Sequence, residues 1–322
     1  MRSAFASPLA SELAAFLAFK RAHGYRYARA EFMLRSFDRF LESRARRRHT
    51  WRLDETILAW LASRPARKAI SVAMDLAVIR EFWRYLHRRD PRRFARQPHW
   101  PRLPTEPRFL ACVLSLEHVR LLLRLVGRLD RPRFRRSLYR ALILLLYCTG
   151  IRVGEALRLR IRDLDLVQRV LFVGESKGRS RWVPFHPSLA VELKRYLRAR
   201  RAFVGFDAAP DDRVFVGANR RQLAISTAGG TFCTLYRSAG LKPARGRLGP
   251  RPYDLRHTFA VHRLTRWYRQ GVDLHRRLPW LSAYLGHVDL LGTETYLTAT
   301  PELLALAADR FRRRYSRNRR TA

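Results

Sequence analysis

Four short segments of the chain contain residue types that act on phosphate esters. In chain order they are residues 149–157 with Arg152 and Glu155, Lys177, residues 253–260 with Arg256, and residues 285–287, where His287 precedes Tyr296 by nine residues. Phosphoryl transfer depends mainly on positioning and on neutralising charge at the nonbridging oxygens, which a guanidinium binds through a bidentate fork. These segments therefore indicate a site that acts on a phosphodiester.

Arg152 and Arg256 are the candidates to bind the scissile phosphate. Both lie beside predicted helix starts, where backbone N–H groups also favour phosphate. Glu155 follows Arg152 by three residues on the same helical face and is expected to hold its guanidinium in place. The alternatives are a solvated side chain for either arginine and a surface ion pair of little energetic value for Glu155.

Breaking a DNA strand without losing the phosphodiester energy requires a nucleophile that stores this energy as a covalent phosphoester. A tyrosine phenolate can do so and can also leave again, and Tyr296 is the candidate among twelve tyrosines. Lys177 lies in a polar stretch between two β-type runs, where a mobile ammonium can protonate a departing 5′-oxygen. Only five of the 66 basic residues are lysine, which favours a specific role for Lys177. The alternative is a solvated lysine, which is common at hairpin tips.

In this order the segments resemble the tyrosine recombinases, also called phage integrases. The family pattern is T-G-x-R-x-x-E, a lysine in a β-hairpin, H-x-x-R, L-G-H and a tyrosine nucleophile, and the resemblance covers residues 113–308. It implies a mobile-element recombinase or integrase that cuts and rejoins DNA strands at specific sites through a 3′-phosphotyrosyl intermediate, without a cofactor or metal. It also implies a two-domain clamp on double-stranded DNA and a synaptic homo-tetramer, and it leaves open whether a partner recombinase is needed.

The resemblance assigns the catalytic set Arg152, Lys177, Tyr253, Arg256, His287 and Tyr296, with Glu155 in support. A neutral imidazole at His287 can hydrogen-bond the scissile phosphate, the alternative being a helix-capping histidine. Tyr253 departs from the family, which usually has histidine there. A phenol, with an ordinary pKa of about 10, donates a hydrogen bond but does not readily take a proton from Tyr296. His257 is rotated about 100° from Arg256 around the helix, so we expect packing support from it.

Three other classes of protein share parts of this pattern. A type IB topoisomerase uses the same residue types but acts as a monomer, and the separate helical module and residues 285–287 favour a recombinase. A DNA-binding accessory protein that has lost cleavage is the second alternative, and Tyr253 supports it. Residues 174–178 match the G-x-S-x-G of hydrolases, but that motif requires a helix after the serine, and here a second strand is predicted.

Composition points to the same kind of partner. The chain of 322 residues has 66 Lys and Arg against 26 Asp and Glu, a formal net charge of +40, and 47% hydrophobic residues. Such a charge on folded cores favours nucleic acid as a partner. The three cysteines lack C-x-x-C spacing, which argues against a zinc site or disulfide framework. We expect a soluble, cytoplasmic, nucleoid-associated protein, because the longest apolar stretch, residues 141–148, is too short to span a membrane.

Hydrophobic periodicity predicts a mainly α-helical protein with a small β-sheet. Four helical stretches, 9–21, 30–43, 54–62 and 70–87, form an N-terminal domain over residues 1–89, and a proline-rich linker covers residues 90–110. The resemblance implies that these are a core-binding (SAM-like) DNA-binding domain followed by an α+β catalytic domain over residues 111–300. There we expect helices at 116–129, 139–147, 187–200, 254–268 and 280–285, a helix starting near 151, and a β-hairpin of 170–173 and 182–185.

The last segment, residues 301–322, is predicted to be a helix at 301–315 followed by an arginine-rich end. Its apolar side chains form one stripe: Leu303, Leu304, Leu306, Ala307 and Phe311. By resemblance to the family's C-terminal helix, we expect this stripe to dock on a neighbouring protomer. Packing on its own catalytic domain is the alternative.

Overall fold

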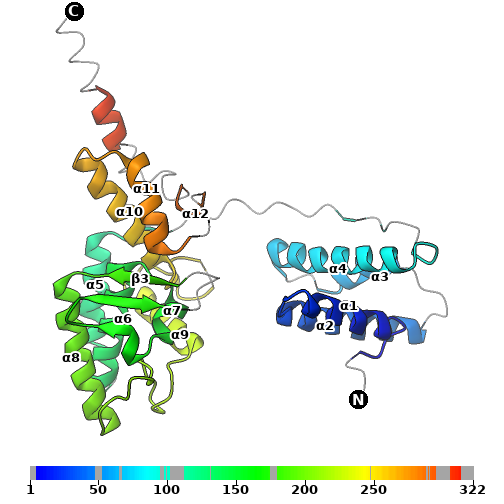
Figure 1. The fold of residues 1–322 in the computed structure, drawn as a ribbon, viewed down its shortest axis with the longest axis horizontal. Helices are drawn as coiled ribbons and strands as arrows, with labels where there is room; N and C mark the ends of the chain where they lie inside the picture. Colours follow the sequence, from blue (N-terminus) through cyan, green and yellow to red (C-terminus); the bar gives the residue numbers. More distant parts are fainter. Residues whose placement is uncertain are drawn as a thin grey trace, which may run out of the picture. The chain divides into compact units, whose positions relative to one another are not determined.

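The computed structural model describes residues 5–47, 53–64, 67–94, 98, 100–101, 112–130, 132–174, 180–246, 248–287, 289, 291–294 and 305–312. The chain divides into two compact units, Met1–Phe109 and Leu110–Ala322 (Figure 1). Among the described residues, no helix is long and apolar enough to cross a membrane.

The N-terminal unit consists of helices. They are α1 (Ala10–Ala22), α2 (Ala28–Arg47), α3 (Leu53–Ala62) and α4 (Ala69–Arg89). Each presents one apolar face to a common core, in which Phe16 and Phe82 lie 5.4 Å apart between ring centroids and Phe37 meets Trp60 edge-on at 5.3 Å. Three of the four predicted helical stretches lie within these elements, and the first, 9–21, starts one residue before α1. The aromatic residues named here are core residues.

The C-terminal unit is an α+β structure with a three-stranded antiparallel sheet in the order β1-β2-β3. Its elements are α5 (Leu116–Gly127), α6 (Arg133–Thr149), α7 (Val153–Arg158), η1 (Ile161–Asp163), β1 (Leu164–Asp165), β2 (Val170–Val173), β3 (Arg181–Pro184), α8 (Pro187–Val204), α9 (Ile225–Ser238), α10 (Asp254–Arg269), α11 (Leu274–Leu285) and α12 (Leu291–Glu294). Residues 305–312 are also helical.

The buried side chains of the sheet belong to the same hydrophobic core as those of α5, α6 and α8, and α6 contacts both α5 and α8 (Figure 1). Strands β2 and β3 pair so that Val170 faces Pro184 and Val173 faces Arg181. Leu171 and Val183 are fully buried in the core that these helices share. The predicted β-hairpin is therefore present, with β3 starting one residue earlier than expected.

Several helices differ from the sequence-based expectation. Helix α6 starts at Arg133 rather than at 139, and α9, α12 and the short η1 were not predicted. Helix α11 begins at Leu274 and contains Pro279, where a start at 280 was expected. The proline costs one backbone hydrogen bond, but Asp273 caps the helix and its apolar face is buried, so the helix continues through it.

Candidate active site

Helix α7 positions the first arginine. Arg152 is its N-cap residue, and the Glu155 carboxylate accepts hydrogen bonds from the Arg152 backbone N–H at 2.8 Å and from its Nη1 at 2.7 Å. The Glu155 side chain is only 1% exposed, whereas that of Arg152 is 21% exposed. The i, i+3 spacing thus places a buried carboxylate under a guanidinium that solvent can reach, as the helical geometry requires.

The second arginine, Arg256, lies in the first turn of α10 and is 1% exposed. Its Nη1 donates to the Gly150 carbonyl at 2.9 Å, and its Nη2 donates to the Leu285 carbonyl at 2.8 Å. Gly150 has a φ of +63°, and a Cβ there would lie 2.4 Å from the Phe259 ring of the same helix. Only glycine fits this turn, which lets the end of α6 approach α10 closely.

A third arginine, Arg181 of β3, joins these two and was not predicted as a site residue. Its Nη2 donates to the Glu155 carboxylate at 3.0 Å, and its Nε donates to the Tyr284 carbonyl at 2.8 Å. Arg181 lies two residues before the buried Val183, so strand alternation turns both side chains to the same face. That alternation was the available signal, because a basic residue on the buried face of a strand needs a carboxylate partner.

These three residues, Arg152, Arg181 and Arg256, form what we call the arginine cluster. They donate to three consecutive carbonyls at the C-terminal end of α11: Arg181 to Tyr284, Arg256 to Leu285 and Arg152 to Gly286, the last at 3.4 Å. The last carbonyls of a helix lack partners within it and carry its negative dipole end, which favours cations. The cluster thus brings together α7, β3, α10 and α11.

His287 follows this helix end directly. Gly286 has a φ of +69°, and the His287 N–H donates to the Ser282 carbonyl at 3.0 Å. The ring Nδ1 is in hydrogen-bond contact with Thr293 Oγ1 at 2.6 Å. Burial, and then the charges of the arginine cluster, lower the pKa of His287 to about 4. The imidazole is therefore neutral at pH 7 and can donate one hydrogen bond from the nitrogen that does not contact Thr293.

Tyr253 and His257 lie one turn apart at the start of α10. Tyr253 is half-buried, and its ring meets that of His257 edge-on at 4.8 Å between centroids. Burial, helped by Arg251 and Arg256, lowers the pKa of His257 to about 4. Burial also raises the pKa of Asp254, whose Oδ1 lies 3.9 Å from His257 Nε2. His257 thus supports the ring of Tyr253, the packing role expected from its place on the helix.

Two predicted catalytic residues, Lys177 and Tyr296, lie outside the described residues. The described strands on either side of Lys177, β2 and β3, form the expected hairpin. Helix α12 precedes Tyr296. Its residue Thr293 is buried, and Thr293 Oγ1 contacts His287 Nδ1.

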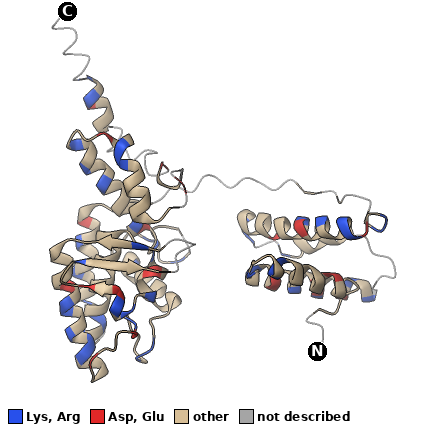
Figure 2. Ribbon diagram, in the orientation of Figure 1, with Lys and Arg blue, Asp and Glu red and all other residues tan. Residues whose placement is uncertain are grey.

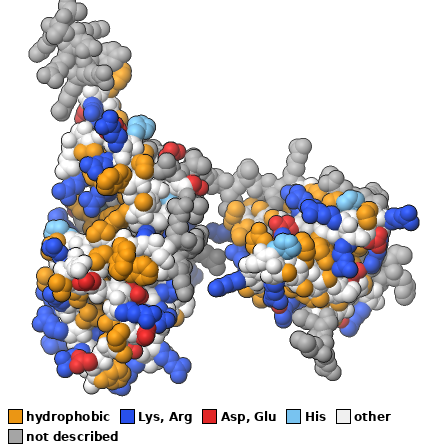
Figure 3. All heavy atoms as spheres, viewed as in Figure 1, with side chains coloured by type: hydrophobic (Ala, Val, Ile, Leu, Met, Phe, Trp, Pro, Cys, Tyr) orange, Lys and Arg blue, Asp and Glu red, His pale blue; other side chains and the backbone are white. Residues whose placement is uncertain are grey.

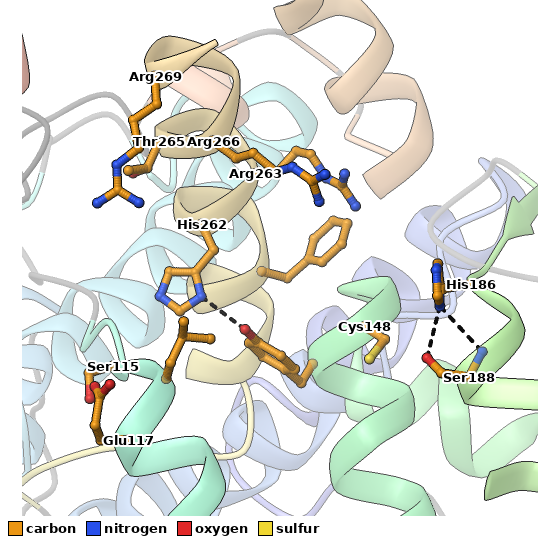
Figure 4. A pocket seen from close by; sticks show the side chains of 13 residues that line it. Ser115, Glu117, Cys148, His186, Ser188, His262, Arg263, Thr265, Arg266 and Arg269 are labelled. Carbon is orange, nitrogen blue, oxygen red and sulfur yellow. Dashed lines mark hydrogen bonds between the residues drawn. The ribbon is translucent and has the colours of Figure 1, made fainter. Parts of the chain in front are cut away.

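A cleft of about 680 Å³ lies between α5, α6, α8 and α10 of the same unit (Figure 4). Figure 4 shows Arg263, Arg266 and Arg269 along α10 at this cleft. His262 Nδ1 lies 3.1 Å from the Tyr147 hydroxyl. None of the predicted site residues that the structure describes lines it. The predicted site residues that the structure describes therefore lie at or beside the arginine cluster and not in this cleft.

Lys and Arg side chains are scattered over both units (Figures 2 and 3). Many carboxylates pair with arginine, as Glu192 does with Arg140 at 3.0 Å. The described residues contain no group of three or more His, Cys, Asp or Glu that could hold a metal ion.

Comparison with known proteins places the chain in a family. The model of the phage integrase family matches residues 124–302. The chain is 36% identical over 307 residues to the "Putative integrase/recombinase y4rB" of Sinorhizobium fredii, an alignment that covers 93% of this chain and 96% of that protein. It is 32% identical over 213 residues to the tyrosine recombinase XerA of Pyrococcus furiosus, with 65% of each covered. This chain belongs to the phage integrase family, the tyrosine recombinases.

Solved structures share the fold. The Tn1549 transposon integrase in complex with transposon right end DNA matches with a TM-score of 0.63 at 17% identity, covering 93% of this chain and 98% of that one. A lambda integrase dimer bound to a core site matches with a TM-score of 0.60 at 18% identity, covering 88% and 96%. Family membership supports site-specific recombination as the class of reaction.

Proposed function

We propose that this chain is a site-specific DNA recombinase whose nucleophile is Tyr296. The phenolate oxygen attacks the scissile phosphorus, the bond from phosphorus to the 5′-oxygen breaks, and that oxygen takes a proton from Lys177. The products are a 3′-phosphotyrosyl bond and a free 5′-hydroxyl. Attack by the 5′-hydroxyl of another strand reverses these steps, so rejoining needs no further source of energy.

The observation that carries this proposal is the arginine cluster at the end of α11. The cluster holds three guanidiniums and one carboxylate, Glu155, which pairs with Arg152 and Arg181, while Arg256 donates to backbone carbonyls. The site therefore has excess positive charge where a phosphodiester would bring a negative one. Preorganised donors of this kind usually contribute the largest share of transition-state stabilisation. Arg152 and Arg256 bind the nonbridging oxygens in this scheme, and the neutral His287 donates a third hydrogen bond.

Tyr253 serves as a further hydrogen-bond donor to the phosphate in this proposal. Its ring is held edge-on by His257, which is itself neutral at pH 7 because its pKa is about 4. A phenol in this position keeps the donor function of the family's usual histidine without its basicity. Double-stranded DNA is the partner, the active assembly on DNA is a synaptic tetramer, and the reaction takes place in the cytoplasm on nucleoid DNA.

Covalent trapping tests the reaction. The protein is incubated in EDTA with a library of nicked genomic fragments, and DNA that stays attached after denaturation is sequenced to give the site. Wild type is expected to trap DNA without added metal and Tyr296→Phe to trap none. Wild type that binds DNA but traps none would favour the accessory DNA-binding protein, and an adduct that disappears on chelation would contradict the metal-free scheme.

A further inference from the structure

We infer that Arg181 is a positioning residue for the DNA-cleavage reaction, acting through Glu155 and the end of α11. The inference rests on the proposed function. It assigns a role to a strand residue outside the catalytic set assigned from the sequence.

The first observation is that Arg181 is committed to protein partners. Its side chain is 8% exposed, and Nε, Nη1 and Nη2 all donate, to Tyr284 O at 2.8 Å and to the two Glu155 oxygens at 3.4 and 3.0 Å. These bonds tie all three guanidinium nitrogens to Glu155 and to the end of α11. We therefore assign Arg181 an action on substrate through the groups that it holds.

The second observation is that Glu155 is shared. The same carboxylate accepts from Arg152 Nη1 and the Arg152 N–H, so it lies between two guanidiniums. A carboxylate held on both sides has a fixed orientation and divides its negative charge between them. With Arg181 absent, Glu155 would pair with Arg152 alone and reduce the positive charge that this residue presents to DNA.

The third observation concerns the glycine before His287. A Cβ on Gly286 would lie 2.7 Å from Arg181 Nη1 and 2.9 Å from its Cζ, so the glycine backbone packs directly on the guanidinium. Together with the bond to Tyr284 O, this contact fixes the turn that carries His287. Arg181 thereby links strand β3 to two groups that the proposed reaction uses, Arg152 and His287.

The test uses the full chain and a nicked duplex that carries the site recovered by covalent trapping. Arg181→Gln is compared with Arg200→Gln, a matched control, because Arg200 is also a buried arginine of this unit and pairs with Asp212 at 3.4 Å away from the cluster. Single-turnover cleavage at saturating protein gives the rate, and a gel shift gives the affinity. Hydrogen exchange of the peptide over residues 282–289 reports on the turn whether or not DNA is cleaved.

Arg181→Gln is expected to cleave about tenfold to a hundredfold more slowly at saturation, the scale of a small misplacement of reacting groups. DNA affinity should change less than about twofold, exchange over 282–289 should rise, and Arg200→Gln should match wild type in all three measurements. Glu155→Gln combined with Arg181→Gln should slow cleavage by less than the product of the two single effects, because both changes disrupt the contact between Arg181 and Glu155. Arg181→Lys, which keeps the charge but not the fork, should fall between wild type and Arg181→Gln.

Wild-type cleavage by Arg181→Gln would overturn the inference, and so would a loss confined to DNA affinity or an equal loss in Arg200→Gln. If Arg181→Gln does not fold, Arg181→Lys decides, and wild-type cleavage by that variant would overturn the inference. Failure of the wild type itself to cleave refutes the proposed function, whereas a cleaving wild type with unaffected Arg181 variants refutes only the role of Arg181.

Discussion

Replacing Gly286 with alanine tests how tightly the end of α11 is built around the arginine cluster. Gly286 has a φ of +69°, a conformation that costs a residue with a Cβ about 1–2 kcal/mol. The new methyl group would also lie 2.7 Å from Arg181 Nη1, and this guanidinium is held at three atoms and cannot simply swing away. Losing one charge-assisted hydrogen bond costs about 1.5–3 kcal/mol more.

Gly240→Ala is the matched control for this change. Gly240 has the same φ of +69° after the end of α9, in the same unit, and a Cβ there would meet nothing within 4 Å. It therefore measures the backbone cost alone. We expect urea denaturation of the full chain to show a loss of about 1–2 kcal/mol in unfolding free energy for Gly240→Ala and about 3–5 kcal/mol for Gly286→Ala.

The two variants should also differ in cleavage. Gly286→Ala should cleave slowly because the displaced Arg181 releases Glu155 and the turn before His287, whereas Gly240→Ala should cleave like wild type. Equal losses of stability in the two variants, or wild-type cleavage by Gly286→Ala, would refute the close packing of Gly286 on Arg181 as a functional constraint.

Three further predictions concern residues proposed to act on DNA or on a second protomer. Lys177→Ala should be strongly impaired on an ordinary substrate but restored on a 5′-bridging phosphorothiolate, whose sulfur leaves without a proton; equal impairment on both would remove Lys177 as the acid. Tyr253→Phe should cleave about tenfold to a hundredfold more slowly while Tyr253→His retains or gains activity, and a Phe variant as fast as wild type would reduce Tyr253 to packing. In the C-terminal segment, Arg310 lies over the Tyr268 ring at 5.3 Å, but Phe311 is 61% exposed, and we expect it to dock on a neighbouring protomer. Truncation after Thr300 should therefore preserve half-site binding but abolish cooperative binding to paired sites in a gel shift. Unchanged cooperativity, or a large loss of thermal stability, would contradict docking on a neighbouring protomer.

Helical periodicity predicted most helices correctly because their apolar faces are regular, and α9 shows where it fails. This helix contains the adjacent glycines Gly229 and Gly230, each of which lowers helix propensity by about 1 kcal/mol relative to alanine. Burial of Phe232, Leu235 and Tyr236 stabilises the helix in the folded chain. Such tertiary stabilisation cannot be read from a local pattern.

The contacts within the site were likewise predictable from the sequence only in part. The i, i+3 spacing was enough to predict the contact between Glu155 and Arg152, because it places the N-cap residue and the third residue of one short helix side by side. Arg256 and Arg181 each donate to a backbone carbonyl of α11, and Arg256 donates also to the Gly150 carbonyl. No side-chain pattern marks a carbonyl as an acceptor. In a chain with 66 basic residues, the sequence does not distinguish Arg181 from the other arginines. The fold does so, because it buries Arg181 beside the Glu155 carboxylate.

The most direct test of the central claim is to map the covalent adduct. Protein trapped on a suicide substrate is digested with protease and nuclease, and mass spectrometry locates the residue and the DNA end that are joined. The account predicts a peptide containing Tyr296 with its phenolic oxygen bonded to a 3′-phosphate, and no adduct in Tyr296→Phe. A bond to another residue, a linkage to a 5′-phosphate, or an adduct that persists in Tyr296→Phe would contradict it.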